Sequence, residues 1–185
     1  KIIAGTRAKK TSTFSYDAFS SINFPIIGKI QDDLVVYYIE EAVKKEQVRF
    51  YDRMDRSVFL LKLTPGMSEK IVPLILENYD CILIEGFGVG GLPDRLAKAF
   101  QEALQHYAPY EKLLIMTTQV TYEGSNMDTY VVGRAAKDNL PFLETYDMTL
   151  EAAYAKIMWV LGLHMQDRSE IERLFYQKIN YDHIG

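Results

Sequence analysis

Over the last two thirds of the chain, continuous apolar runs alternate with segments that have the pattern of helices. The runs at 58–63, 80–85 and 113–118 are nearly continuous in Val, Ile, Leu, Phe and Met, as in strands buried on both faces of a parallel sheet. Between them, apolar residues recur at helical spacing over 94–107, and a further helix is expected over 69–77. Short connections between such elements form right-handed crossovers. The pattern predicts an α/β fold, a three-layer sandwich on a small parallel sheet.

Four helix starts carry residues typical of caps. Ser68 precedes the first helix, Asp128 precedes a helix to residue 138, and Thr149 precedes one to residue 161. Ser169 opens the pattern SEIE, a capping box, ahead of a last amphipathic helix. Because a side-chain oxygen at such a position accepts a hydrogen bond from a free amide of the first turn, we expect each of the four to cap its helix.

The opening residues lack this regularity. A polar, Ser/Thr-rich extended run covers 6–13, and a turn-rich segment covers 17–25. Further on, 34–38 predicts a strand and 40–46 a short helix. Since a segment this polar cannot supply its own hydrophobic core, we expect it to lie against another domain.

Composition narrows the class of protein. The 185 residues, 48% hydrophobic, are enough for one compact domain plus a tail. The net charge of −4 gives no reason to expect a nucleic-acid partner, and no apolar run approaches the roughly 18 to 20 residues of a membrane span. The single cysteine, Cys81, lies in an apolar run and fits a buried thiol in a reducing cytoplasm.

A glycine-rich stretch, GFGVGGLP, follows the second predicted strand. It is either a tight corner between strand and helix or a loop whose backbone amides approach a ligand. Pro93 stands where a dinucleotide fingerprint needs its third glycine, and Pro93-Asp94 replaces the Lys and Ser/Thr of a phosphate P-loop. Nucleotide binding is therefore a weak interpretation.

Candidate chemistry elsewhere is sparse. The three histidines are isolated from other ligand types, so we expect no metal or other cofactor. Lys9 and Lys10 are adjacent, and on an extended chain they point to opposite faces. If one meets solvent, the other faces a neighbouring domain. A desolvated lysine can act as a base for a hydroxyl nucleophile, although two solvated lysines on an edge strand would show the same sequence.

An ordered set of motifs covers nearly the whole chain and comprises residues 5–12 (GTRAKKTS), 17–25 (DAFSSINFP), 87–93 (FGVGGLP), 118–119 (TQ), 130–134 (YVVGR) and 147–156 (DMTLEAAYAK). This set resembles the bacterial-type L-asparaginases, the cytosolic type I branch in particular. The resemblance implies an amidohydrolase that converts L-asparagine to L-aspartate and ammonia. In the family a threonine attacks the amide carbon, and a second threonine with a Lys and Asp pair transfers protons. The R-x-x-K run assigns that lysine to Lys10 and leaves Lys9 at the surface.

The resemblance also implies a division of the chain. Residues 1–19 would be a remnant of the amino-terminal catalytic domain, 20–56 a linker and 57–185 the carboxyl-terminal α/β domain. The catalytic threonines would lie outside this sequence, so this piece alone should be inactive. The resemblance also implies homodimers or homotetramers. In these the glycine loop would form one edge of an active site shared with the neighbouring subunit, and Gly90 and Gly91 would bind substrate.

Two departures from the family stand out. Many members carry asparagine in the glycine loop where this chain has Gly91, which offers only a backbone amide. Some type I enzymes bind a second asparagine through an arginine and a cysteine, and the matching positions here are Glu85 and Val120. We expect Glu85 to repel that ligand's carboxylate, so cooperative regulation through this site finds no support.

Two other functions fit the sequence. One is the amidotransferase component that releases ammonia from glutamine for tRNA charging, a member of the same superfamily. The other is a non-catalytic α/β module whose glycine loop holds a small anion on backbone amides.

Overall fold

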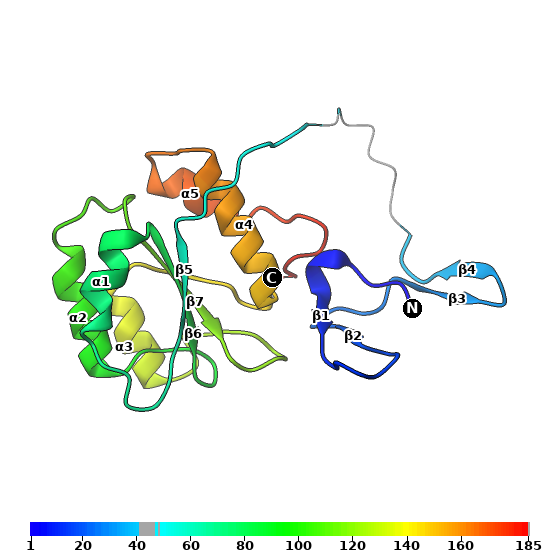
Figure 1. Ribbon diagram of the computed structural model, residues 1–185, viewed down its shortest axis with the longest axis horizontal. Helices are drawn as coiled ribbons and strands as arrows, with labels where there is room; N and C mark the ends of the chain where they lie inside the picture. Colours follow the sequence, from blue (N-terminus) through cyan, green and yellow to red (C-terminus); the bar gives the residue numbers. More distant parts are fainter. Residues whose placement is uncertain (41–46, 48, 185) are drawn as a thin grey trace.

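A computed structural model describes residues 1–40, 47 and 49–184 (Figure 1). Its centre is a parallel sheet in the order β5-β6-β7-β8. The strands are β5 (Val58–Lys62), β6 (Cys81–Gly86), β7 (Leu113–Thr118) and β8 (Phe142–Glu144). The first three coincide with the predicted apolar runs, and the α/β class is confirmed.

Helices cover both faces of this sheet (Figure 1). One face packs on α1 (Ile71–Asn78), α2 (Asp94–Leu104) and α3 (Val131–Asn139), and the other on α4 (Leu150–Gly162) and α5 (Arg168–Phe175). Successive strand residues point to opposite faces, so Ile82 joins the first apolar core and Leu83 the second. Every residue of β6 and β7 is buried, which is why these two strands read as continuous apolar runs. The edge strand β5 leaves Leu60 and Lys62 exposed.

The strand β8 was missed by sequence reasoning. It has only three residues, follows Pro141 and ends in the buried carboxylate of Glu144. A segment so short and so polar at its end carries no apolar run, and β8 is a strand because it pairs with β7 from Leu114 to Met116.

Of the predicted caps, only Thr149 is confirmed, since its side chain accepts a hydrogen bond from the amide of Ala152. The prediction for Ser68 was wrong, because α1 begins at Ile71 without a side-chain cap. Asp128 instead pairs with Lys137, and α3 begins at Val131. In the last helix Asp167, rather than Ser169, is the cap. The second helix ends at Leu104 instead of 107.

The opening segment forms two small hairpins beside the sheet domain (Figure 1). A 3-10 turn, η1 (Gly5–Arg7), leads into β1 (Ala8–Lys10), which pairs with β2 (Phe19–Ser21), and β3 (Gly28–Gln31) pairs with β4 (Leu34–Tyr37). The strand predicted at 34–38 is thus confirmed. Most of the helix predicted at 40–46 falls on residues 41–46, outside the described residues. Among the helices that the structure describes, none is long and apolar enough to cross a bilayer.

Candidate functional site

The two candidate lysines lie on β1 and point to opposite faces. Lys10 pairs with Phe19 across the hairpin and its side chain is exposed. Lys9 is half-buried, with its Nζ 4.0 Å from a carboxylate oxygen of Glu151 on α4. The expected split between solvent and a neighbouring domain is present. Lys9, however, was expected at the surface, and it is instead the lysine that faces the α/β domain.

The hairpin lies at the carboxyl end of the sheet. A small cavity of about 10 Å³ is lined by Lys9 together with Thr117 and Thr118 at the end of β7 and Thr149 before α4. That volume is about enough for one water molecule. Ligands of open α/β sheets bind outside the carboxyl ends of their strands, and β1 lies at that end of this sheet.

The glycine loop after β6 is fixed from several sides. The amide of Gly90 donates to the carbonyl of Phe87 at 3.0 Å, and the amide of Asn126 donates to the carbonyl of Val89 at 2.7 Å. The Thr118 hydroxyl donates to the Gly88 carbonyl. These bonds hold the loop through its carbonyl groups and define its path.

Two glycines of this loop have backbone angles that favour glycine. Gly90 has φ +108° and Gly91 has φ +133°. A Cβ at Gly90 would lie 3.0 Å from Cγ of Met116, whereas one at Gly91 would come no closer than 3.7 Å to Gly133. In the part of the chain that the structure describes, the amides of Gly88 and Gly91 donate to no protein acceptor. The loop is therefore a tight corner that also leaves amides available to a ligand.

Glu85, at the end of β6, is buried and does not present a free charge. Its Oε2 lies 3.0 Å from Nζ of Lys62 on β5, and its backbone carbonyl accepts a hydrogen bond from the side chain of Gln119. The ion pair offsets part of the negative charge of Glu85, and the expected repulsion of a ligand carboxylate stays a prediction. Val120 is exposed and offers no polar group to a carboxylate.

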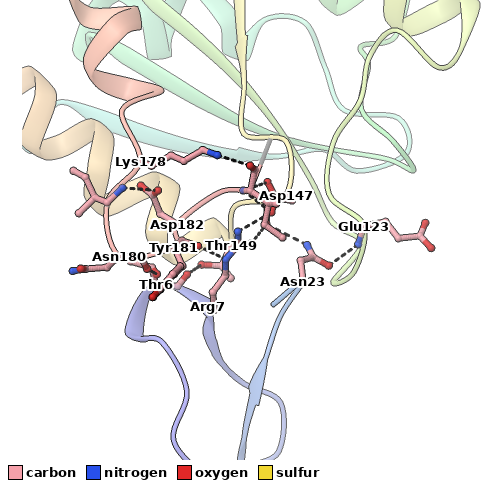
Figure 2. Close-up of polar contacts among 12 residues, drawn as sticks. Thr6, Arg7, Asn23, Glu123, Asp147, Thr149, Lys178, Asn180, Tyr181 and Asp182 are labelled. Carbon is pink, nitrogen blue, oxygen red and sulfur yellow. Dashed lines mark hydrogen bonds and ion pairs between the residues drawn. The ribbon is translucent and has the colours of Figure 1, made fainter. Parts of the chain in front are cut away.

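A polar junction joins the opening segment to the α/β domain (Figure 2). Arg7 is fully buried, and its guanidinium donates to the Asp147 carbonyl at 2.6 Å, to Asp147 Oδ2 at 2.7 Å and to the Tyr181 carbonyl. The hydrogen bond from the guanidinium to the Asp147 carboxylate is charge-assisted, and such bonds are about twice as strong as those between neutral groups. Arg7 is therefore anchored between the loop before α4 and the carboxyl-terminal segment.

Further hydrogen bonds surround this junction. The Asn23 side chain donates to the Asp147 carbonyl at 3.2 Å and accepts from the amide of Glu123 at 2.9 Å. The Thr149 hydroxyl donates to the Thr6 carbonyl at 2.9 Å. The β1–β2 hairpin thus contacts the α/β domain through Thr6 and Arg7, which precede β1, and through Asn23, which follows β2.

Arg7, Asn23 and Asp147 all lie within motifs identified in the sequence, but the sequence alone assigned none of them a role. Arg7 and Asp147 are 140 positions apart, and no spacing rule connects residues so distant. The available signal was chemical: an arginine in a Ser/Thr-rich segment that must lie against another domain needs an acidic partner there.

The parallel sheet is covered by helices on both faces and carries a glycine loop and a lysine-bearing hairpin at its carboxyl end, where α/β domains commonly bind ligands. Residues 57–175 match the family described as the glutaminase/asparaginase C-terminal domain. The chain belongs to the glutaminase/asparaginase family, which confirms the resemblance.

Individual relatives support the same placement. The L-asparaginase of Thermococcus kodakarensis is 35% identical over 179 residues, which cover 97% of this chain and 53% of that protein. A component of the glutamyl-tRNA(Gln) amidotransferase of Pyrococcus abyssi is 32% identical over 174 residues, 92% of this chain and 38% of that protein. The chain therefore spans about half, or less, of the length of these relatives.

Two solved structures share the fold. The thermostable L-asparaginase from T. kodakarensis superposes with a TM-score of 0.88 at 33% identity, over 98% of this chain and 54% of that one. L-asparaginase I from Vibrio cholerae gives a TM-score of 0.81 at 21% identity, over 97% and 54% of the two chains. The second likeness shows the fold alone.

Proposed function

We propose that this chain is part of an L-asparaginase, an amidohydrolase that converts L-asparagine and water to L-aspartate and ammonia. The observation that carries the proposal is the 35% identity to an L-asparaginase over 97% of the chain. This match extends beyond the family domain at 57–175 into the opening hairpins, which carry Lys10.

In the proposed reaction a threonine from outside this sequence attacks the side-chain amide carbon, and the C–N bond breaks as the leaving nitrogen takes up the proton lost by the threonine hydroxyl and departs as ammonia. Water then cleaves the acyl-enzyme ester and restores the threonine hydroxyl. Lys10 takes part in proton transfer with a second threonine. Its exposed side chain, on a strand anchored to the α/β domain, is accessible to such a residue.

The glycine loop is proposed to bind substrate through backbone amides. The amide of Gly91 donates to no acceptor among the described residues, and the loop is held by Thr118 and Asn126. Fixed amide donors suit a carboxylate or carbonyl oxygen, because they need no reorganisation when the ligand binds. Gly90 belongs to the same rigid turn.

We also propose self-association into homodimers or homotetramers. Large apolar side chains are exposed beside the glycine loop, on the turns after β6 and β7 and at the start of α3: Phe87, Val120, Tyr122, Tyr130, Val131 and Val132. Exposed apolar groups gathered in one region favour a protein partner. Light scattering on the natural protein should show a dimer or tetramer, and Val131→Glu should shift it toward the monomer.

The proposed compartment is the cytoplasm. Burial raises the pKa of the Cys81 thiol far above its usual range, and a thiol that stays protonated is unreactive. A single inert cysteine suits a reducing compartment.

A second candidate function is ammonia release from glutamine as one component of a tRNA amidotransferase. It is favoured by the 32% identity over 174 residues to a component of such an enzyme. That function predicts a preference for glutamine and a dependence on a partner protein and tRNA. The third candidate, a non-catalytic anion-binding module, rests on the available loop amides and predicts no turnover.

The test is ammonia release from asparagine and from glutamine by the natural full-length protein that contains this chain. We expect asparagine to be the better substrate. Lys10→Met should lower kcat by about 10² to 10⁴-fold, the usual contribution of a general acid or base. Lys9→Met is the matched control and should stay within about threefold of wild type. Equal activity of Lys10→Met and wild type would remove Lys10 from the reaction, and preference for glutamine would favour the amidotransferase.

A further inference from the structure

We propose that Arg7 and Asp147 are positioning residues that set the place of Lys10. This inference rests on the proposed function, because it concerns the same proton transfer. It is carried by the junction of Figure 2, in which a fully buried arginine ties the hairpin of Lys10 to the loop before α4.

The first step of the argument is the cost of the contact. Removing a guanidinium from water is expensive unless charge and hydrogen bonds compensate it. The Arg7 side chain has no exposed surface, and that of Asp147 is only 19% exposed. Asp147 supplies both a carboxylate oxygen and a backbone carbonyl, so Arg7 has one strongly favoured position.

The second step is the short path from this anchor to Lys10. Only Ala8 and Lys9 separate the two residues, so an extended strand places their Cα atoms about 10 Å apart. The Arg7 carbonyl accepts the amide of Ile22 at 2.9 Å, and the ladder continues from Ala8 opposite Ser21 to Lys10 opposite Phe19. A shift of Arg7 is therefore transmitted along a paired strand.

The third step is a second attachment at the same residue. Asn23 follows β2 closely, has φ +53° and donates to the Asp147 carbonyl that Arg7 also uses. Both strands of the hairpin are thus connected to Asp147, one through Arg7 and one through Asn23. Fixing two strands at one residue restricts rotation of the hairpin as well as its translation.

The expected consequence for the reaction follows from geometry. A displacement of about 1 Å at a reacting group can cost about 10²-fold in rate. Since Lys10 is proposed to transfer a proton and not to bind the substrate, a misplaced hairpin should lower kcat and leave KM nearly unchanged.

The experiment uses the natural full-length protein and Asp147→Asn, which keeps the size of the side chain and the backbone carbonyl but removes the charge. We expect kcat to fall about 10- to 100-fold, with KM within about threefold of wild type. Asp128→Asn is the matched control, because Asp128 also pairs with a cation, Lys137 at 2.7 Å, but lies away from the junction. Its kcat should stay within about twofold of wild type.

A double-mutant cycle distinguishes positioning from general damage. In the Lys10→Met background, Asp147→Asn should lower kcat no further, because the group that it positions is already gone. Losses that multiply in the two backgrounds would overturn the inference and leave the proposed function intact. Unchanged kcat in Asp147→Asn would do the same. A wild-type protein that releases no ammonia would overturn the proposed function and this inference together.

A second variant covers the case in which Asp147→Asn does not fold. Asn23→Asp removes the amide donor to Asp147 and keeps an acceptor for the Glu123 amide. It should lower kcat by a smaller factor, again only while Lys10 is present. Hydrogen exchange of the Ile22 and Thr11 amides should accelerate, with sheet amides such as Leu83 unchanged. Equal acceleration in both regions would contradict local positioning.

Discussion

The α/β domain and the opening segment of this chain are stabilised by different kinds of interaction. The domain has two apolar cores, one on each face of its sheet. In residues 1–40, by contrast, the only buried apolar side chains are Ala4 and Ile22, and the contacts with the domain centre on Arg7. Apolar burial is non-directional and spread over many residues, whereas the junction depends on a few bonds with fixed geometry.

The difference has a consequence for mutation. A disruptive substitution in either core should weaken the whole domain, because closely packed side chains transmit strain to one another. A disruptive substitution at the junction should displace one hairpin and leave the sheet intact. The proposed reactive lysine lies on the region that is fixed by few contacts, so its position is sensitive to single polar residues.

The largest expected effect tests the cores. Leu76 and Leu74 lie on the same helix, α1, but Leu76 is 1% exposed and Leu74 is 57% exposed. We expect Leu76→Ala to lower the free energy of unfolding by about 3 to 5 kcal/mol, and Leu74→Ala to change it by less than about 1 kcal/mol. Denaturant unfolding gives both values. Equal losses would mean that the core is not what stabilises the domain.

An intermediate effect tests whether ion pairs also matter inside the α/β domain. Lys137 lies 2.7 Å from a carboxylate oxygen of Asp128 and 2.8 Å from one of Glu144, whose side chain is 2% exposed. Lys137→Met leaves the Glu144 charge buried without its cation. We expect a loss of about 2 kcal/mol, less than for a fully buried pair because Lys137 itself is 33% exposed.

The pH dependence of this effect has a definite sign. Hydrogen bonds to Asp128 and Glu144 raise the pKa of Lys137 above its ordinary 10.5. A group whose pKa is higher in the folded state stabilises the protein fully at pH values below its unfolded-state pKa. This stabilisation is lost as pH rises through the folded-state pKa. The difference between wild type and Lys137→Met should therefore be constant between about pH 7 and about pH 10 and shrink above pH 10. Lys98→Met, at an exposed position on α2, should show no such difference.

The smallest expected effect concerns a residue shared by the two regions. The Thr149 hydroxyl caps α4 by accepting from the Ala152 amide at 3.1 Å, and it donates to the Thr6 carbonyl at 2.9 Å. Thr149→Ala should cost about 1 kcal/mol, measured by thermal unfolding, while Thr149→Ser should cost only a few tenths. A serine variant as unstable as alanine would show that the methyl group, rather than the hydroxyl, is what matters.

The accuracy of the sequence-based predictions also differs between the apolar strands and the polar features of the chain. The strands β6 and β7 were predicted because every residue in them is buried, and β5 because its run is apolar even though this edge strand exposes Leu60 and Lys62; continuous apolar runs are a strong signal. The caps were predicted less well, since Ser68, Asp128 and Ser169 are all good capping types but local geometry selected other starts. The positions of helix ends depend on such details.

Sequence alone determined the class of fold, the glycine corner and the choice of Lys10 as a candidate, because these follow from periodicity and from motifs that are contiguous in the chain. Tertiary structure decided which lysine faces the domain, that Glu85 is paired with Lys62, and that Arg7 meets Asp147. Those facts depend on contacts between residues that are separated in the chain, and no local pattern of residues connects such positions.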